Sequence, residues 1–130
     1  MITYEWRAEF ENGELDALHA QGFGHPILDS DWVKQVQDHS LGWVIARSEE
    51  RLVGFVNVAW DGDAHAFILD TLVDTAFRKA GVGTRLVDLA TSHARLAGCE
   101  WLHVDFDDEL EQFYFAACGF RPTKAGLIAL

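Results

Sequence analysis

Hydrophobic and polar residues are arranged along this chain in two kinds of segment. Short runs rich in β-branched and aromatic residues predict strands, and they fall at residues 2–10, 42–47, 52–60, 64–73 and 101–105. Segments whose apolar residues recur three and four positions apart predict helices, at residues 14–21, 31–39 and 83–97. A further helix is predicted from Asp108, which fits a capping box with Glu111, to Gly119. Residues 122–130 predict a closing strand.

The connections between these segments indicate how the strands pair. Ser48–Arg51 is a short charged connection that predicts a hairpin, and Asp61-Gly62 is the signal of a type I′ turn. The strand at 64–73, the next helix and the strand that follows form a crossover unit, whose two strands pair in parallel. The predicted fold class is therefore α/β, with a single domain over residues 1–130 and a central mixed, mostly antiparallel sheet flanked by helices.

The composition excludes several classes of protein. The two cysteines, Cys99 and Cys118, each stand beside a glycine and are interpreted as buried, reduced thiols. The six histidines are scattered without an HExxH or CxxC motif, so we predict no metal site. No basic and apolar leader opens the chain, and no apolar run approaches the roughly 18 residues of a membrane span. These features predict a cytoplasmic protein that does not enter the membrane.

The net charge of −11 is unevenly distributed. Residues 78–98 carry a net charge of +3 and form the only positive island on an otherwise acidic chain. An island of this size favours a small anionic ligand, whereas a nucleic acid needs a broad basic face. We therefore expect no nucleic-acid partner.

A glycine-rich turn opens this positive island. It reads Arg78-Lys79-Ala80-Gly81-Val82-Gly83-Thr84 and leads directly into the predicted helix. Gly81 and Gly83 permit positive φ, and backbone N–H groups can then converge on an anion beside the positive end of the helix dipole. The turn predicts a phosphate cradle, although glycines at such a turn also serve tight packing. It is neither a GxxxxGK[ST] loop nor a GxGxxG fingerprint.

The spacing Arg-x-x-Gly-x-Gly, five residues after Leu72-Val73, resembles the acyl-coenzyme A (acyl-CoA) loop of the GNAT superfamily of N-acetyltransferases. An aromatic segment that ends in Gly119-Phe120 resembles a second landmark of this family. The resemblance implies the GNAT fold and an enzyme that transfers an acetyl group from acetyl-CoA directly to a primary amine of a small molecule or protein. It also implies a V-shaped opening between the strands at 64–73 and 101–105.

Carried over position by position, the resemblance assigns the cofactor contacts to the end of one strand and to the glycine turn. The expected cofactor-binding residues are Leu72, Val73, Arg78, Lys79, Ala80, Gly81, Val82, Gly83 and Thr84.

The acid that protonates the leaving thiolate is a less direct match. In many GNAT enzymes it is a tyrosine four residues before the glycine of the Gly-Phe pair, a position that Phe115 holds here. Tyr114, one residue earlier, shares a helical face with Leu110 and Phe113 and is our candidate, through a one-residue irregularity of the helix. The alternative interpretation is a core tyrosine with a satisfied hydroxyl.

The amine must lose a proton before it attacks, so a base is also expected. His103 precedes Val104, where several relatives carry a glutamate, and Asp70 lies three residues before Val73. Asp105 is positioned to orient the imidazole of His103. Each of these residues is alternatively a structural hydrogen-bonding group.

Two other functions fit the same sequence. A CoA-binding sensor or interaction domain without turnover is favoured by Phe115 at the acid position, and an unrelated phosphate-binding α/β domain is the third hypothesis. The acidic composition favours a cationic amine as acceptor. Three tryptophans are expected either to wall an acceptor pocket or to belong to the core: Trp32, Trp43 and Trp60. Exposed edge strands predict a homodimer.

Overall fold

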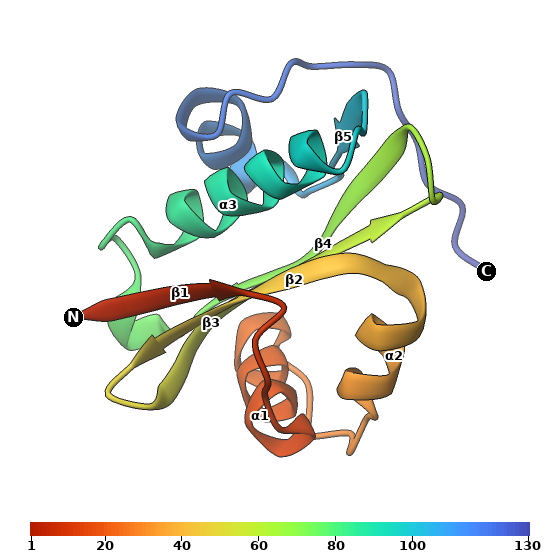
Figure 1. Ribbon diagram of the computed structural model, residues 1–130. Helices are drawn as coiled ribbons and strands as arrows, with labels where there is room; N and C mark the ends of the chain where they lie inside the picture. Colours follow the sequence, from red (N-terminus) through yellow and green to blue (C-terminus); the bar gives the residue numbers. More distant parts are fainter.

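The computed structural model describes residues 1–130 and shows a three-layer α/β arrangement (Figure 1). Five strands form one mixed sheet in the order β1-β2-β3-β4-β5, antiparallel except for the β4–β5 pair. Helices α1 and α2 cover one face, and α3 covers the other with the chain that follows β5. The strands are β1 Ile2–Trp6, β2 Ser40–Ser48, β3 Arg51–Trp60, β4 His65–Val73 and β5 Trp101–His103. The helices are α1 Asn12–Phe23, α2 Trp32–His39 and α3 Val82–Leu96, and shorter turns of helix occupy Thr75–Phe77, Asp108–Leu110 and Gln112–Ala117.

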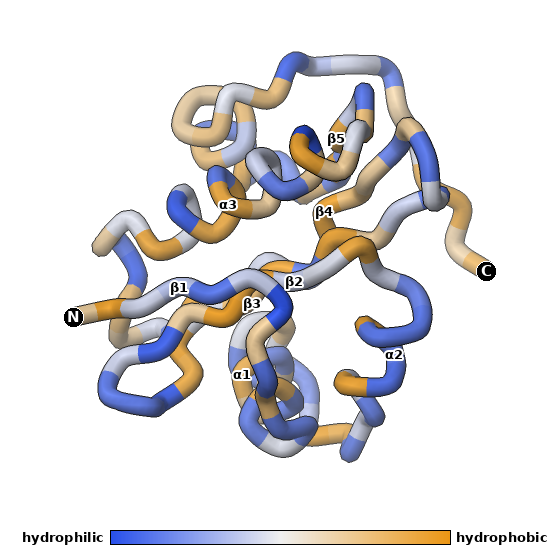
Figure 2. Tube along the Cα trace, in the orientation of Figure 1, coloured by the Kyte–Doolittle hydropathy of each residue, from blue (hydrophilic) through white to orange (hydrophobic).

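The predicted fold class is confirmed, and it follows from the two-sided burial of the sheet. Val44, Val56 and Val58 face α3 and pack with its Leu86 and Ala90, whereas the opposite face packs on α1 and α2. Figure 2 shows the hydrophobic positions concentrated along the central strands and on the inner sides of the helices. Full burial of one such side chain contributes about 1.5–3 kcal/mol. The two layers of helix are thus fixed against the strands that form the site.

The N-terminal elements differ from their predicted limits. The first strand ends at Trp6, not at residue 10, because Arg7 adopts φ 58° and its N–H donates to the carbonyl of Trp43 (2.7 Å). Helix α1 is longer than predicted at both ends, since the Glu14 carboxylate accepts from the N–H of Glu11 and completes a capping box (3.0 Å). Gly24, at φ 68°, ends the helix.

The hairpin predicted at Ser48–Arg51 is confirmed, whereas the turn type predicted at Asp61-Gly62 is not. Glu49 and Glu50 both have positive φ (49° and 73°), as a type I′ turn requires of its central residues. At Asp61-Gly62 only the glycine has positive φ (84°), so the predicted type I′ turn is wrong. The Asp61 carboxylate instead accepts from the N–H groups of Asp63 (2.8 Å) and His65 (3.1 Å) and holds a wider loop.

The β2–β3 turn gives a stability prediction. Glu50 holds a left-handed conformation that costs a non-glycine residue roughly 1–2 kcal/mol, whereas glycine loses about 0.5–1 kcal/mol in chain entropy. Glu50→Gly is therefore expected to stabilise the fold by about 0.5–1 kcal/mol, which urea unfolding would measure. The matched control Glu100→Gly changes an exposed residue outside the left-handed region and is expected to destabilise. Equal effects of both variants on stability would show that the left-handed backbone of Glu50 is not strained.

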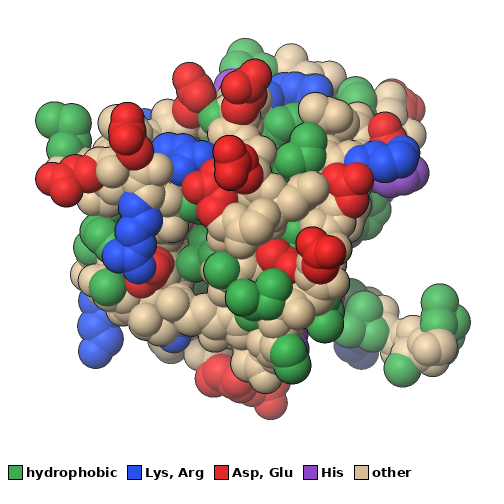
Figure 3. Space-filling view, turned by 90° about the horizontal axis from the view of Figure 1, so that it is seen from below, with side chains coloured by type: hydrophobic (Ala, Val, Ile, Leu, Met, Phe, Trp, Pro, Cys, Tyr) green, Lys and Arg blue, Asp and Glu red, His purple; other side chains and the backbone are tan.

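The chain after β5 departs most from prediction. No strand forms in residues 122–130, whose side chains are all exposed, and the C-terminal segment projects from the body of the molecule (Figure 3). The predicted capping box at Asp108 and Glu111 is also wrong, because a 3₁₀ turn begins there without a side-chain cap and is followed by a π-helix over Gln112–Ala117. Leu127 and Ile128 have no apolar surface to cover within the chain and stay exposed. None of the helices has both the length and the apolar character needed to cross a bilayer.

Candidate active site

The parallel pairing of β4 and β5 is short and leaves an opening. It consists of three residue pairs, His65 with Trp101, Ala66 with Leu102 and Phe67 with His103. Strand β4 continues from there to Val73 without β5 beside it. The edge of β4 that faces this opening therefore has no strand partner after Phe67.

A β-bulge lies in this unpaired part of β4. Leu69 pairs with Asn57 and Leu72 with Phe55 on β3, so Asp70 and Thr71 together oppose a single residue. Asp70 has φ 53°, in the left-handed region that β-strands otherwise avoid. Such strained backbone occurs where the surrounding structure holds it, often at functional sites.

The bulge directs two neighbouring side chains to opposite faces of the sheet. The carboxylate of Asp70 turns to α1, where its Oδ1 lies 3.1 Å from Nε2 of His19. Thr71 turns toward the π-helix, and its hydroxyl opposes the burial effect on the pKa of Tyr114. Thr71 Oγ1 is also the one buried side-chain polar atom without a hydrogen-bond partner of good geometry. A titratable group thus lies on each side of the same strand edge.

Tyr114 reaches this edge from the π-helix. The N–H of Cys118 donates to the carbonyl of Phe113 five residues earlier (2.9 Å), so the helix contains the kind of irregularity that the displaced tyrosine predicts. The Tyr114 side chain is buried among the rings of Phe106, Phe113 and Phe120. Burial raises the pKa of Tyr114 above the ordinary 10.0. The hydroxyl of Thr71 acts in the opposite direction, to a smaller extent. The phenol therefore carries its proton at neutral pH.

At the far end of β4 the glycine turn leads into α3. Gly81 is the residue before the helix, at φ 81°, and no side chain caps α3. The first helical bond runs from the N–H of Arg85 to the carbonyl of Gly81 (3.1 Å), so the preceding N–H groups have no partner within the helix. A Cβ on Gly81 would meet nothing within 4 Å. The turn thus presents free N–H groups to open space, which fits the pyrophosphate of CoA.

The second glycine of the turn serves packing. A Cβ on Gly83 would lie 3.0 Å from the ring of Phe113. This contact brings α3 against the π-helix and so places Tyr114 near the end of β4. The packing interpretation is thus supported at Gly83, whereas no atom of the chain lies within 4 Å of where a Cβ of Gly81 would stand.

Comparison with known proteins agrees with this geometry. The sequence model of the Acetyltransferase (GNAT) family matches residues 2–120. The chain belongs to this family. It is therefore an acyltransferase. A search of the curated proteins found no match.

The solved structures that resemble this chain share its fold. An acetyltransferase from Trypanosoma brucei superposes with a TM-score of 0.84 at 18% identity, covering 99% of each chain. Glucosamine-6-phosphate N-acetyltransferase from Arabidopsis thaliana gives 0.78 at 17% identity, covering 98% of each chain. An aminoglycoside N-acetyltransferase in complex with CoA gives 0.79 at 19% identity, covering 100% of this chain and 94% of that one. The GNAT fold thus extends over essentially the whole chain.

The other predicted base of this GNAT chain lies in a separate group. His103 Nε2 is 2.7 Å from Nδ1 of His65, and its ring stacks on Phe67. It makes no hydrogen bond with Asp105, so the predicted orienting contact is wrong. No hydrogen bond connects His103 with Asp70. The two candidates are therefore alternatives and do not form one catalytic pair.

Sequence reasoning missed the histidines that accompany Asp70. His19 comes from α1 and His25 from the loop after it, and their Nδ1 and Nε2 atoms lie 2.6 Å apart. Neither stands in a motif, and His19 is 51 residues from Asp70 in the chain. His19 and Asp70 come together only in the folded protein, where α1 packs against β4. Trp32 and Trp43 belong to the core beside this group, so they do not line an open pocket.

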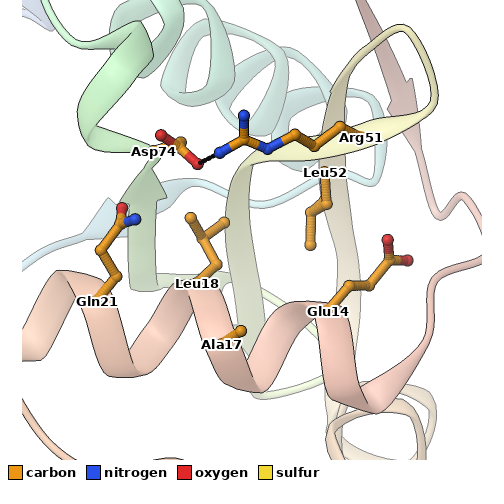
Figure 4. A pocket seen from close by; sticks show the side chains of 7 residues that line it. All are labelled: Glu14, Ala17, Leu18, Gln21, Arg51, Leu52 and Asp74. Carbon is orange, nitrogen blue, oxygen red and sulfur yellow. Dashed lines mark hydrogen bonds and ion pairs between the residues drawn. The ribbon is translucent and has the colours of Figure 1, made fainter.

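A pocket of about 290 Å³ lies beside this site, between α1 and the start of β3 (Figure 4). Figure 4 shows Asp74 paired with Arg51 across its rim, at 2.5 Å, with Gln21 and Leu18 below them on α1. The other carboxylate that lines the pocket, that of Glu14, is paired with Arg47 on β2 (2.7 Å). Both acids are thus already neutralised, and the pocket contains none of the predicted catalytic or cofactor-binding residues.

The loop that carries His25 is held by a buried carboxylate. Asp16 is 2% exposed and accepts from the N–H of Asp29 (2.5 Å) and the indole N–H of Trp32 (3.1 Å). Burial raises the pKa of Asp16, but the hydrogen bonds from Trp32 and the loop backbone outweigh it and lower the pKa below its ordinary 3.8. One ionised side chain therefore ties α1 to the loop and to α2.

Asp16→Asn is expected to lower the melting temperature by several degrees at pH 7, because an amide nitrogen would face N–H donors. A lowered folded-state pKa stabilises above the unfolded pKa and stops doing so as pH falls through the folded value. The difference from wild type should accordingly shrink as pH falls below the unfolded pKa near 4 and through the lower folded value, where Asp16 takes up a proton. Melting curves between pH 3 and 7 would measure it. The exposed Asp63→Asn serves as control, and a pH-independent difference would contradict this account.

Proposed function

We propose that this GNAT enzyme transfers the acetyl group of acetyl-CoA directly to a primary amine of a small molecule or protein. The observation that carries the proposal is the unpaired edge of β4. It begins after Phe67, passes the bulge where Asp70 and Thr71 diverge, and ends at Val73, ahead of the glycine turn and the uncapped start of α3. A thioester arm along this edge would have its anionic end at the turn and its reactive end between two titratable groups.

The roles follow from this placement. Backbone groups of Leu72 and Val73 would contact the arm, and N–H groups of the turn would bind the pyrophosphate together with the positive side chains. The turn residues in this role are Arg78, Lys79, Ala80, Gly81, Val82, Gly83 and Thr84. Acetyl-CoA supplies an acyl group that is already activated as a thioester. Tyr114, protonated at neutral pH, would donate its proton to the departing sulfur.

The base would be Asp70 or His103. Asp70 is at the bulge and turns to the face that α1 and α2 cover, whereas His103 lies at the last β4–β5 pair. Each would remove a proton from the ammonium, whose ordinary pKa near 10 prevents attack at neutral pH.

The acceptor would approach on the face of α1 and α2. Figure 3 shows carboxylates spread over this face among hydrophobic and basic side chains, and the chain as a whole carries a net charge of −11. Such a surface attracts a cationic amine that carries an apolar part. Two of the structural neighbours are named for amino-sugar substrates, glucosamine-6-phosphate and aminoglycosides, which supports a small-molecule amine as the first class to test.

The experiment is calorimetric titration with acetyl-CoA, followed by a thiol-release assay against polyamines, amino sugars, aminoglycosides and lysine peptides. Saturable binding is expected, with release of the CoA thiol in the presence of at least one amine. Binding without thiol release in the presence of any of these amines would favour the CoA-binding domain without turnover. Absence of binding would overturn the proposal. A homodimer and a cytoplasmic location stay predictions, the first of which sedimentation equilibrium would test.

A further inference from the structure

Two histidines form a line of hydrogen bonds with Asp70 that none of the roles above uses. His25 Nδ1 lies 2.6 Å from the carbonyl oxygen of Pro26, and His25 Nε2 lies 2.6 Å from His19 Nδ1. His19 Nε2 lies 3.1 Å from Asp70 Oδ1. The line runs from the loop after α1, through α1, to the bulge of β4. The side chains of His19 and Asp70 are 17% and 22% exposed, so this end of the line is partly open to solvent.

The hydrogens along this line can be counted. Both ends are acceptors, a backbone carbonyl and a carboxylate, so the three contacts need three hydrogens, whereas two neutral imidazoles carry two. The carbonyl of Pro26 cannot ionise, and its short contact requires a hydrogen on His25 Nδ1. A neutral His25 then accepts at Nε2 from His19 Nδ1, and His19 Nε2 is left bare. The missing hydrogen thus falls at the contact with Asp70, which is the longest of the three.

We infer that His19 is the proton acceptor for the substrate ammonium, with Asp70 contacting the ammonium and His25 positioning His19. This inference rests on the proposed function. One N–H bond of the ammonium breaks, and its electron pair stays on nitrogen as the attacking lone pair. The proton passes by way of the Asp70 carboxylate to His19 Nε2. The imidazolium that results donates to Asp70 and to His25, so uptake of the proton completes the line of hydrogen bonds.

The surroundings of His19 favour this role. Its ring packs against Phe23 (4.5 Å between centroids) and Trp32 (4.7 Å), which carry no charge. Asp70 and His25 are the titratable groups that hydrogen-bond to it, from β4 and from the loop. The positive charge formed on His19 is therefore balanced by one carboxylate and by no competing cation. The strained φ of Asp70 holds that carboxylate toward α1.

The kinetic test compares the pH dependence of kcat/KM for wild type, His19→Gln and His25→Gln with an amine that wild type acetylates. His19→Gln is expected to lower kcat/KM by about 100-fold at neutral pH, a typical loss for a general base. It should also remove the acidic limb of the profile and leave the affinity for CoA unchanged. His25→Gln, which can still accept from His19, should shift the limb with a smaller loss. The exposed His39→Gln is the control and should match wild type.

A second measurement follows the histidine ring protons by NMR on the protein without ligands. The Nδ1 hydrogens of His25 and His19 are expected to be seen in hydrogen bonds, with His19 Nε2 bare, as the count of hydrogens requires. An active His19→Gln enzyme with the acidic limb intact would overturn the inference, as would loss of that limb in His103→Gln. If wild type acetylates no amine although the rings carry these hydrogens, the proposed function fails, and the role of His19 as base fails with it.

Discussion

Gly81→Glu is expected to weaken the binding of acetyl-CoA by about 100-fold or more. The glycine is followed by the free N–H groups of α3, and open space surrounds the position of its missing Cβ. A glutamate there would place a like charge against the pyrophosphate, which costs several kcal/mol, and each 1.4 kcal/mol weakens binding tenfold. Calorimetric titration of wild type and variant measures the loss directly.

The other end of the same helix provides a matched control. Gly98 also has positive φ (91°) and no atom within 4 Å of its missing Cβ. Gly98→Glu therefore brings the same charge and a similar backbone strain of roughly 1–2 kcal/mol without approaching the cradle. It is expected to lower the melting temperature about as much as Gly81→Glu and to bind acetyl-CoA like wild type. If both variants weaken binding equally, the loss is caused by backbone strain, and Gly81 does not belong to a phosphate cradle.

Tyr114→Phe is expected to lower kcat by about 100-fold or more, within the range that a positioned general acid contributes, and to leave the affinity for CoA unchanged. The hydroxyl would be lost from the bulge of β4 while the ring stays packed among its aromatic neighbours. Steady-state kinetics together with calorimetry separates the two quantities. A fall in affinity with kcat intact would indicate a binding role for the hydroxyl instead.

Two further variants sharpen this result. Tyr4→Phe removes the other tyrosine hydroxyl of the chain and is expected to leave turnover unchanged. In the double variant Tyr114→Phe with Phe115→Tyr, the hydroxyl returns at the family's usual position. It is not expected to restore activity, because the π-helix turns residue 114 inward and leaves residue 115 half-buried against Phe106. Full rescue would show that the helix register differs in the working enzyme.

The raised pKa of Tyr114 also has a consequence for stability. Burial favours the neutral phenol in the folded state, so its contribution to stability is complete below the unfolded pKa near 10 and declines as pH rises through the higher folded value. The wild type should therefore lose stability above pH 10 more steeply than Tyr114→Phe. Urea unfolding between pH 9 and 11 would compare the slopes.

Much of the fold was predictable because local patterns specify it. The five strands and the helices α1, α2 and α3 follow from periodicity, and the left-handed φ at Gly81 and Gly98 follows from glycine at the ends of a helix. The errors occur where local signals compete with tertiary contacts. Glu49-Glu50 adopts positive φ with no favourable residue because β2 and β3 pair on either side of it, and Asp61-Gly62 does not form the turn that its residues favour.

The sequence by itself determined the family and the order of the elements, and it predicted the glycine cradle, because each depends on spacing within a short stretch of chain. It also indicated that Tyr114 is displaced by one residue from the expected acid position. Only the tertiary structure decided that a bulge separates Asp70 from Thr71 and that Asp70 meets His19 across 51 positions of sequence. Such contacts depend on strand register and on how a helix seats against the sheet, and these are set by packing over the whole core, which no local pattern encodes.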